Sequence, residues 1–208
     1  MSSQRYHHGD LKQALLDQAQ KMLRDEGVEA MSLRRLAAAA GVSHMAPYAH
    51  FKNKAELLQA VATEGLNALA QEMERVAESI SEPAALVLEY GVVYVEYALQ
   101  HPQLYRLMLG QVGAFPDAAP DSALQSAKWQ ALQQASKRPF RLLQGAFALV
   151  CDDEVQTRAQ ALGAWSLVHG VAALITDGHI RVPQGMNIRD FLMLAGDHLP
   201  GTAALPQP

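Results

Sequence analysis

The spacing of apolar residues constrains the fold most strongly, because they recur at every third or fourth position along almost the whole chain. That period places them on one face of an α-helix, whereas a half-buried strand would alternate apolar and polar residues. The first stripe contains Leu11, Leu15, Ala19 and Leu23, and Gly27 follows it as a typical helix end. Since β-branched runs are short throughout, the sequence predicts an all-α protein.

Glycine, proline and helix-capping residues divide this pattern into separate helices. The predicted helices span about residues 11–27, 32–41, 43–51, 54–79, 83–100, 104–109, 121–151, 154–177 and 188–199. Ser32 and Ser43 are expected to cap the second and third helices. Pro139 is expected to kink or split the long stretch 121–151, and residues 113–120 are expected to form a loop.

The composition is that of a folded protein of a reducing compartment. Half of the residues are hydrophobic and only 18% are charged, which argues against a disordered chain. The single cysteine, Cys151, cannot form an internal disulfide, which fits the cytoplasm. The first ten residues contain no apolar segment, and no apolar run reaches the roughly 18 residues of a membrane helix. We therefore expect a cytoplasmic protein without membrane contact.

Charge is distributed unevenly along the chain. Residues 1–60 contain eight Lys and Arg against six Asp and Glu, whereas residues 61–208 contain nine against fifteen. A mildly basic head on an acidic body suits a DNA-binding head, although the asymmetry is weak.

Residues 32–54, SLRRLAAAAGVSHMAPYAHFKNK, have the pattern of a helix-turn-helix. The small residues 37–40 allow two helices to cross closely, and Gly41 can adopt the left-handed conformation that ends the first helix. The second helix would then place its N-terminal residues in the major groove of DNA.

This stretch resembles the DNA-binding domain of the TetR family of transcriptional regulators. The resemblance rests on Ser-Leu-Arg at 32–34, Ala-Gly-Val-Ser at 40–43, and Tyr48, Phe51, Lys52 and Lys54. It implies a homodimer with an N-terminal domain of three helices, residues 1–53, that binds a double-stranded DNA operator. The implied DNA-binding residues are Ser32, Arg34, Ser43, His44, Met45, Ala46, Pro47, Tyr48, His50, Lys52 and Lys54. Residues 44–47 are expected to face base edges, and Phe51 is expected in the core.

Two positions depart from the family pattern. Pro47 stands where an apolar residue with a backbone N–H is usual, and Ala49 replaces a bulkier residue. Residues 44–47 also lack Arg, Asn and Gln, which are the usual bidentate readers of bases. We therefore expect specificity to depend on His44, on apolar contacts and on DNA shape. Arg35 fits a solvated helix face slightly better than a DNA contact.

The resemblance extends to residues 97–110 and 164–178, which are similar to the C-terminal domain of a TetR subgroup marked by Trp165, His169 and Gly170. It implies that residues 54–208 form a larger helical domain for ligand sensing and dimerisation. Trp165 and His169 are four residues apart and therefore share one helix face.

The last two long helices, 154–177 and 188–199, are implied to form the dimer interface. Small residues at helical spacing in the first of them would let a partner helix approach closely. The candidate interface residues are Gly163, Ser166, Gly170, Phe191, Leu192 and Ala195.

A pocket for an unknown small-molecule effector is implied by the resemblance alone. Its candidate residues are Tyr90, Tyr94, Tyr105, Met108, Trp129, Phe140 and His169. For each of them plain core packing is the alternative, and for His169 the alternative is a buried histidine with satisfied hydrogen bonds.

Enzymatic chemistry is not indicated. The chain contains no glycine-rich phosphate loop, no zinc-ligand spacing and no plausible Ser-His-Asp arrangement, so we expect no catalytic residue, metal or cofactor. Asp152, Asp153 and Glu154 are more simply a helix N-terminus than a cation site. The sequence is therefore interpreted as a ligand-released repressor that binds a palindromic operator, with an activator as the open alternative.

Overall fold

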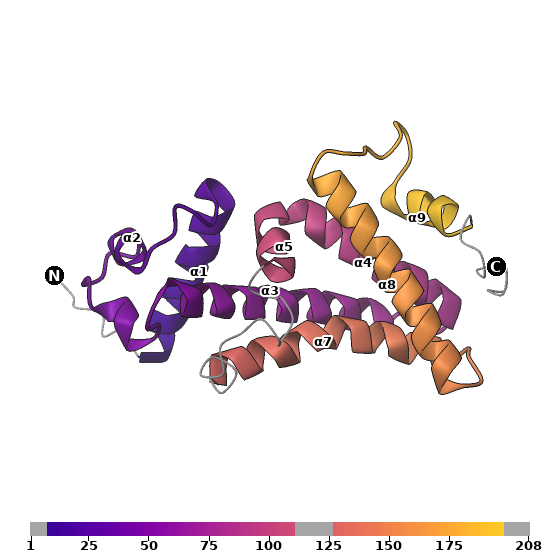
Figure 1. Ribbon diagram of the computed structural model, residues 1–208, viewed down its shortest axis with the longest axis horizontal. Coiled ribbons are helices and arrows are strands. Elements are labelled where there is room, and N and C mark those ends of the chain that lie inside the picture. Colours follow the sequence, from indigo (N-terminus) through magenta and orange to yellow (C-terminus); the bar gives the residue numbers. More distant parts are fainter. Residues whose placement is uncertain (1–7, 111–126, 198–208) are drawn as a thin grey trace. The chain divides into compact units, whose positions relative to one another are not determined.

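The computed structural model describes residues 8–110 and 127–197, and all the regular elements in these two ranges are helices (Figure 1). The predicted all-α fold is thereby confirmed. The elements are α1 (His8–Glu26), α2 (Leu33–Ala39), the 3₁₀ helix η1 (Ala46–Ala49), α3 (Lys54–Ala77), α4 (Pro83–Gln100), α5 (Pro102–Leu109), α7 (Ala127–Phe147), α8 (Glu154–Thr176) and α9 (Ile188–Asp197).

Several helix ends lie where the sequence predicts them. Gly27 and Gly41 follow α1 and α2 with φ angles of +80° and +68°, a conformation that favours glycine. The Ser32 hydroxyl caps α2 by accepting a hydrogen bond from the Arg35 N–H at 3.2 Å. The Asp153 carboxylate caps α8 in the same way through the Gln156 N–H, at 2.9 Å.

The prediction of an α-helix over residues 43–51 is wrong, because this segment forms only the short 3₁₀ helix η1. The Tyr48 N–H donates to the Met45 carbonyl at 3.1 Å, and the His50 N–H donates to the Pro47 carbonyl at 3.0 Å. Both bonds reach three residues back, and Pro47 has no N–H to start the four-residue pattern of an α-helix. Ser43 is also not the cap, since η1 begins after Met45, which makes no side-chain capping bond.

The expected split at Pro139 does not occur, because α7 is one helix that contains Pro139. The ring is among the fully buried side chains, so packing against neighbouring residues offsets the lost backbone bond. The α7 helix ends at Phe147, four residues before Cys151. The predicted loop 113–120 and the predicted start of this helix at residue 121 lie outside the described residues.

The chain packs as two compact units, of which the first combines residues 1–65 with residues 103–134. Its core contains Leu15, Leu36, Phe51 and Leu57, each at most 1% exposed, which confirms the expected burial of Phe51. The Gln20 side-chain amide of α1 donates to the Glu64 carboxylate of α3 at 2.8 Å. The boundary predicted between residues 53 and 54 separates a DNA-binding domain from a ligand-sensing domain. The packing units do not test that division, so it stays a prediction.

The second unit combines residues 66–102 with residues 135–208, and within it α4 packs against both α8 and α9. Gly91 lies at this packing site. A Cβ atom built on it would lie 3.1 Å from Val168 Cγ1 of α8 and 3.4 Å from Leu192 Cδ1 of α9. The close approach of these helices therefore requires a residue without a side chain on α4.

An ion pair joins two further helices of the second unit. The Arg138 guanidinium of α7 binds the Glu74 carboxylate of α3 through Nη2, at 2.6 Å to Oε2, and through Nε, at 3.1 Å to Oε1. This two-point geometry fixes the relative orientation of both side chains.

Candidate functional site

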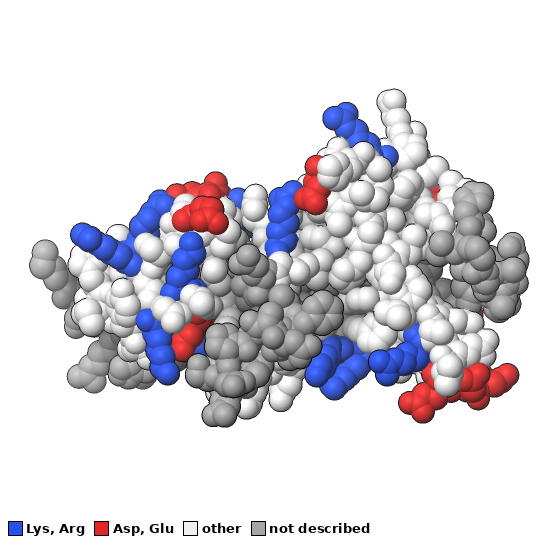
Figure 2. Space-filling view, viewed as in Figure 1, with Lys and Arg blue, Asp and Glu red and all other residues white. Residues whose placement is uncertain are grey.

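The helix-turn-helix geometry is formed by α2, the turn at Gly41 and η1. Ser43, His44 and Met45 are exposed, and Met45 and Tyr48 remain 72% and 48% exposed. Figure 2 shows Lys and Arg side chains over the α1 and α2 part of this unit, with Asp and Glu side chains between them. Exposed large side chains beside positive charge form a surface suited to nucleic acid.

Pro47 requires a correction. Its ring is among the fully buried side chains of the first unit, so in this structure it packs in the core and is not presented to bases. At η1, position 47 is buried, whereas positions 45 and 48 are exposed.

The other predicted DNA-binding residues are accessible to different extents. Arg34 and Lys52 are exposed, whereas Ser32, Ala46, His50 and Lys54 are half-buried. The hydroxyl of Ser32 is already used to cap α2.

The Arg35 side chain is hydrogen-bonded to residues at and just after the end of α1, so its charge is paired within the protein. Its Nη2 lies 2.5 Å from the Glu26 carboxylate, and its Nη1 donates to the Ala30 carbonyl at 2.7 Å. Of the two adjacent arginines, only Arg34 therefore carries a charge without a described ion-pair partner.

Sequence reasoning missed Lys128, at the start of α7. Its Nζ donates to the His50 carbonyl at 2.7 Å, forms an ion pair with the Glu56 carboxylate, and lies 5.5 Å from the centre of the Phe51 ring. These contacts join positions more than 70 residues apart in the chain, so no local pattern could indicate them.

Glu56 receives a second hydrogen bond, from the Lys52 N–H at 3.0 Å. Burial raises the pKa of Glu56, but the hydrogen bonds and charges of Lys128 and Lys52 outweigh it and hold the pKa below its ordinary value. Glu56 is therefore ionised at neutral pH and attracts Lys128.

In the second unit, aromatic side chains from three helices meet. The Tyr94 hydroxyl of α4 lies 3.1 Å from Nε2 of His169 on α8, and their rings stack at 4.9 Å. Trp165 packs edge-on against Tyr94 at 5.1 Å and against Phe140 of α7 at 5.6 Å. Trp165 is thus the centre of the cluster, although sequence reasoning did not place it among the pocket residues.

His169 is neutral in this setting. Burial lowers its pKa to about 4, and a hydrogen bond to the Trp165 backbone opposes only part of that shift. A neutral imidazole can accept a hydrogen bond from the Tyr94 hydroxyl at Nε2. The Tyr94 hydroxyl thus provides a hydrogen-bond partner for Nε2 of this buried histidine.

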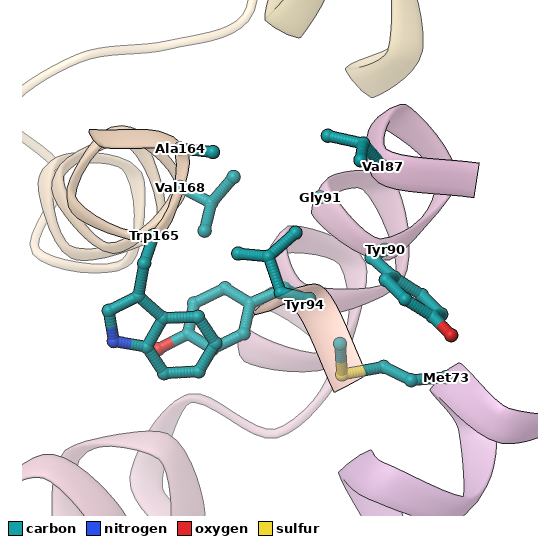
Figure 3. Close-up of a pocket in the computed structure, with 9 residues that line it drawn as sticks. Met73, Val87, Tyr90, Gly91, Tyr94, Ala164, Trp165 and Val168 are labelled. Carbon is teal, nitrogen blue, oxygen red and sulfur yellow. The ribbon is translucent and has the colours of Figure 1, made fainter. Parts of the chain in front are cut away.

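A small cavity lies beside this cluster (Figure 3). Its lining is almost entirely apolar and consists of Met73, Val87, Tyr90, Gly91, Tyr94, Leu143, Ala164, Trp165 and Val168. The ring of Tyr94 lies beside Trp165, whereas the Tyr90 hydroxyl points away from that pair. The volume is about 20 Å³, enough for about one water molecule and far below the roughly 300 Å³ of a small-ligand pocket.

The structure brings together only some of the predicted effector residues. Tyr90 and Tyr94 line the cavity, and Phe140 and His169 contact Trp165 at its edge. Tyr105, Met108 and Trp129 are instead buried in the first unit.

The outer face of α8 is apolar and exposed. A Cβ atom added to Gly163 or Gly170 would meet no atom within 4 Å, and Leu162 is 54% exposed. By length and composition alone, this helix could cross a membrane. Only 22% of its most apolar segment of 18 residues is buried within the chain. Few charged side chains lie over its middle (Figure 2).

The predicted interface residues of α9 differ in exposure. Phe191 and Ala195 are half-buried, but Leu192 is 5% exposed and contacts the Gly91 site. Leu192 is therefore a core residue of this chain, and Met193 and Leu194 carry the exposed apolar surface of α9.

Comparison with known proteins gives matches over both parts of the chain. Residues 15–61 match the tetR family of bacterial regulatory proteins. Residues 87–193, more than half of the chain, match the tetracyclin repressor-like C-terminal domain. The nicotine-responsive transcriptional repressor HdnoR of Paenarthrobacter nicotinovorans is 39% identical over 77 residues, which are 37% of this chain and 40% of HdnoR. The match therefore spans less than half of that relative.

Two solved structures are similar over nearly the whole chain. A protein of unknown function from Rhodococcus sp. RHA1 has a TM-score of 0.75 at 30% identity, covering 94% of this chain and 96% of its own. AibR, solved with isovaleryl coenzyme A and operator DNA, has a TM-score of 0.60 at 18% identity, covering 90% and 97%. At that identity AibR shows the shared fold alone. The helix-turn-helix geometry and the two consecutive domain matches show that this chain belongs to the TetR family of bacterial transcriptional regulators.

Proposed function

We propose that this TetR-family regulator is a cytoplasmic, ligand-released repressor that binds a palindromic operator as a homodimer. The observation that carries this proposal is the exposed surface of residues 43–45 and Tyr48 at the second element of the helix-turn-helix. Met45 is 72% exposed and therefore does not belong to the core of this chain. A role in contacting the major groove would account for its exposed position.

The burial pattern refines the DNA contacts that we propose. His44, Met45 and Ala46 would face base edges, and Pro47 would support them from the core. Phosphates would be bound by Ser32, Arg34, Ser43, Tyr48, His50, Lys52 and Lys54. Of the base-facing residues only His44 has a side chain that donates hydrogen bonds, so His44 and DNA shape would supply specificity.

A dimer would bury the exposed apolar face of α8 together with α9. Two recognition elements must reach half-sites about 34–36 Å apart, which one chain cannot do. We propose that Gly163, Ser166 and Gly170 let the partner helix approach closely. Phe191, Met193, Leu194 and Ala195 would complete the interface, whereas Leu192 stays within the protomer.

Ligand release would act through the aromatic cluster of the C-terminal domain, proposed to comprise residues 54–208. The cavity holds only about 20 Å³, so an effector larger than a water molecule would have to displace Tyr94 or Trp165 and would thereby select another conformation. AibR, which shares the fold, was solved with both isovaleryl coenzyme A and operator DNA. The Trp165, His169 and Gly170 pattern supports placement in the subgroup that those residues mark.

Selection from a random-sequence DNA pool, followed by footprinting, tests the proposal. We expect a protected site with two inverted half-sites about one helical turn apart. An enriched sequence with a single half-site would contradict the dimeric mode of binding.

A further inference from the structure

Lys128 lies at the place where η1 passes into α3. The His50 carbonyl at the end of η1 accepts a hydrogen bond from Lys128 Nζ at 2.7 Å. A carbonyl at a helix end has no partner within the helix. Lys128, which comes from α7, therefore fixes the backbone at this end of the recognition element.

The same lysine also holds the connecting segment through Glu56. The Glu56 carboxylate accepts the Lys52 N–H at 3.0 Å and pairs with Lys128, while its own N–H is capped by Asn53 Oδ1 at 2.9 Å. His50, Lys52 and Asn53 are thus each hydrogen-bonded to Lys128 or Glu56.

The cluster is sheltered from solvent. The side chains of Lys128 and Glu56 are 31% and 15% exposed, and the Lys128 ammonium lies over the buried Phe51 ring at 5.5 Å. The charge of Lys128 is therefore engaged within the protein and is not presented to a phosphate.

We propose that Lys128 is a positioning residue for operator binding. It acts by holding the backbone of residues 50–52, so that the exposed residues at the start of η1 keep the orientation in which they meet base edges. The inference rests on the proposed DNA-binding function. It assigns to α7, outside the N-terminal domain predicted from sequence, a direct part in shaping the DNA-binding surface.

Salt dependence separates positioning from direct contact with DNA. Each phosphate contact that a protein loses reduces the slope of log affinity against log salt by about one. A lysine that only positions other residues should weaken binding at every salt concentration without changing that slope.

The experiment compares Lys128→Met with Lys52→Met and with Lys137→Met, which removes an exposed lysine from the same helix α7. Operator affinity is measured over a salt series with the selected site. We expect Lys128→Met to lower affinity on the order of tenfold with an unchanged slope, Lys52→Met to reduce the slope by about one, and Lys137→Met to have no effect. Lys128→Arg retains a donor and a charge and should recover most of the affinity.

Wild-type affinity in Lys128→Met, or a slope reduced by one, would overturn the proposal. Amide hydrogen exchange of the full chain without DNA provides a second readout. The Lys52 N–H should exchange faster in both Lys128→Met and Glu56→Gln than in wild type, and unchanged exchange in both would also overturn the proposal. If the wild-type chain bound no specific DNA, the repressor proposal would fail, whereas the exchange comparison would still test whether Lys128 and Glu56 hold the backbone of residues 50–53.

Discussion

The Tyr94 hydroxyl and the His169 imidazole face each other across α4 and α8, with 3.1 Å between the oxygen and Nε2. The pair stacks beside Trp165, which lines the small cavity described above. Any effector that enters this cavity must first separate or rotate these rings. The pair is therefore both a stabilising contact and the proposed site of regulation.

Removing the Tyr94 hydroxyl should destabilise the fold modestly. We expect Tyr94→Phe to lower the free energy of unfolding by about 1 kcal/mol, because His169 loses a hydrogen bond while ring packing is kept. Urea denaturation measures the change. A Tyr48→Phe variant, altered at an exposed ring, should unfold like wild type, and an equal effect in both would refute the specific role of Tyr94.

Burial of His169 predicts a pH dependence of stability. Its pKa is lowered from 6.5 to about 4 by burial, so the unfolded chain binds more protons between these values. The free energy of unfolding should be unaffected by His169 above pH 6.5. It should fall as the pH decreases below that value, by up to roughly 3 kcal/mol. His169→Gln should lose less stability between pH 7 and pH 5, a range above most carboxylate titrations. Parallel curves for both proteins would argue against a buried neutral histidine.

Gly91 should tolerate no branched side chain. A Cβ atom there already lies 3.1 Å from Val168 Cγ1, so we expect Gly91→Val to lower the free energy of unfolding by about 1–3 kcal/mol. Gly145→Ala is the matched control on α7, where nothing lies within 4 Å of the added atom. It should raise stability by about 0.5–1 kcal/mol. Thermal denaturation compares the two, and a harmless Gly91→Val would show that α4 does not pack tightly here.

The open face of α8 predicts a mutation that separates subunits without unfolding them. Gly170→Arg meets no atom within 4 Å of its Cβ in the chain itself, but it would intrude on a partner helix. We expect a monomeric protein by analytical ultracentrifugation with helical content unchanged by circular dichroism. Gly145→Arg, equally open but on α7, should remain dimeric. A dimeric Gly170→Arg would place the interface elsewhere.

The two adjacent arginines should differ in their effects on DNA binding. Arg35 is held by Glu26 and Ala30, so Arg35→Ala should cost less than about 1 kcal/mol of stability and leave the salt dependence of binding unchanged. Arg34 is exposed, and Arg34→Ala should reduce the salt slope by about one. Equal slopes in both variants would remove Arg34 from the phosphate contacts.

The order and ends of the helices could be predicted because local chemistry determines them. Gly27 and Gly41 adopt positive φ angles where they were expected to end helices, and Ser32 caps α2 through its own hydroxyl. The 3₁₀ form of η1 was missed. Pro47 lacks the N–H that an α-helix would need, while the residues around it follow a helical pattern. The sequence alone does not say which of these two effects is larger.

The parts of the candidate site that escaped prediction depend on contacts between distant residues. Lys128 reaches His50 and Glu56 from α7, and Leu192 packs inward because Gly91 leaves space for it. Periodicity assigns a residue to a helix face but does not say whether its own chain or a partner covers that face. The exposure of Gly163 and the burial of Leu192 could therefore only be distinguished in three dimensions.

Sequence-specific binding is the most direct test of the central claim. The measurement titrates the purified full chain against the selected operator and against a scrambled duplex of equal length, at two salt concentrations. The account predicts a preference for the operator that persists at the higher salt concentration, with two chains bound to each duplex. Weak binding to both duplexes that disappears with salt, in protein stripped of bound ligand by refolding, would contradict it.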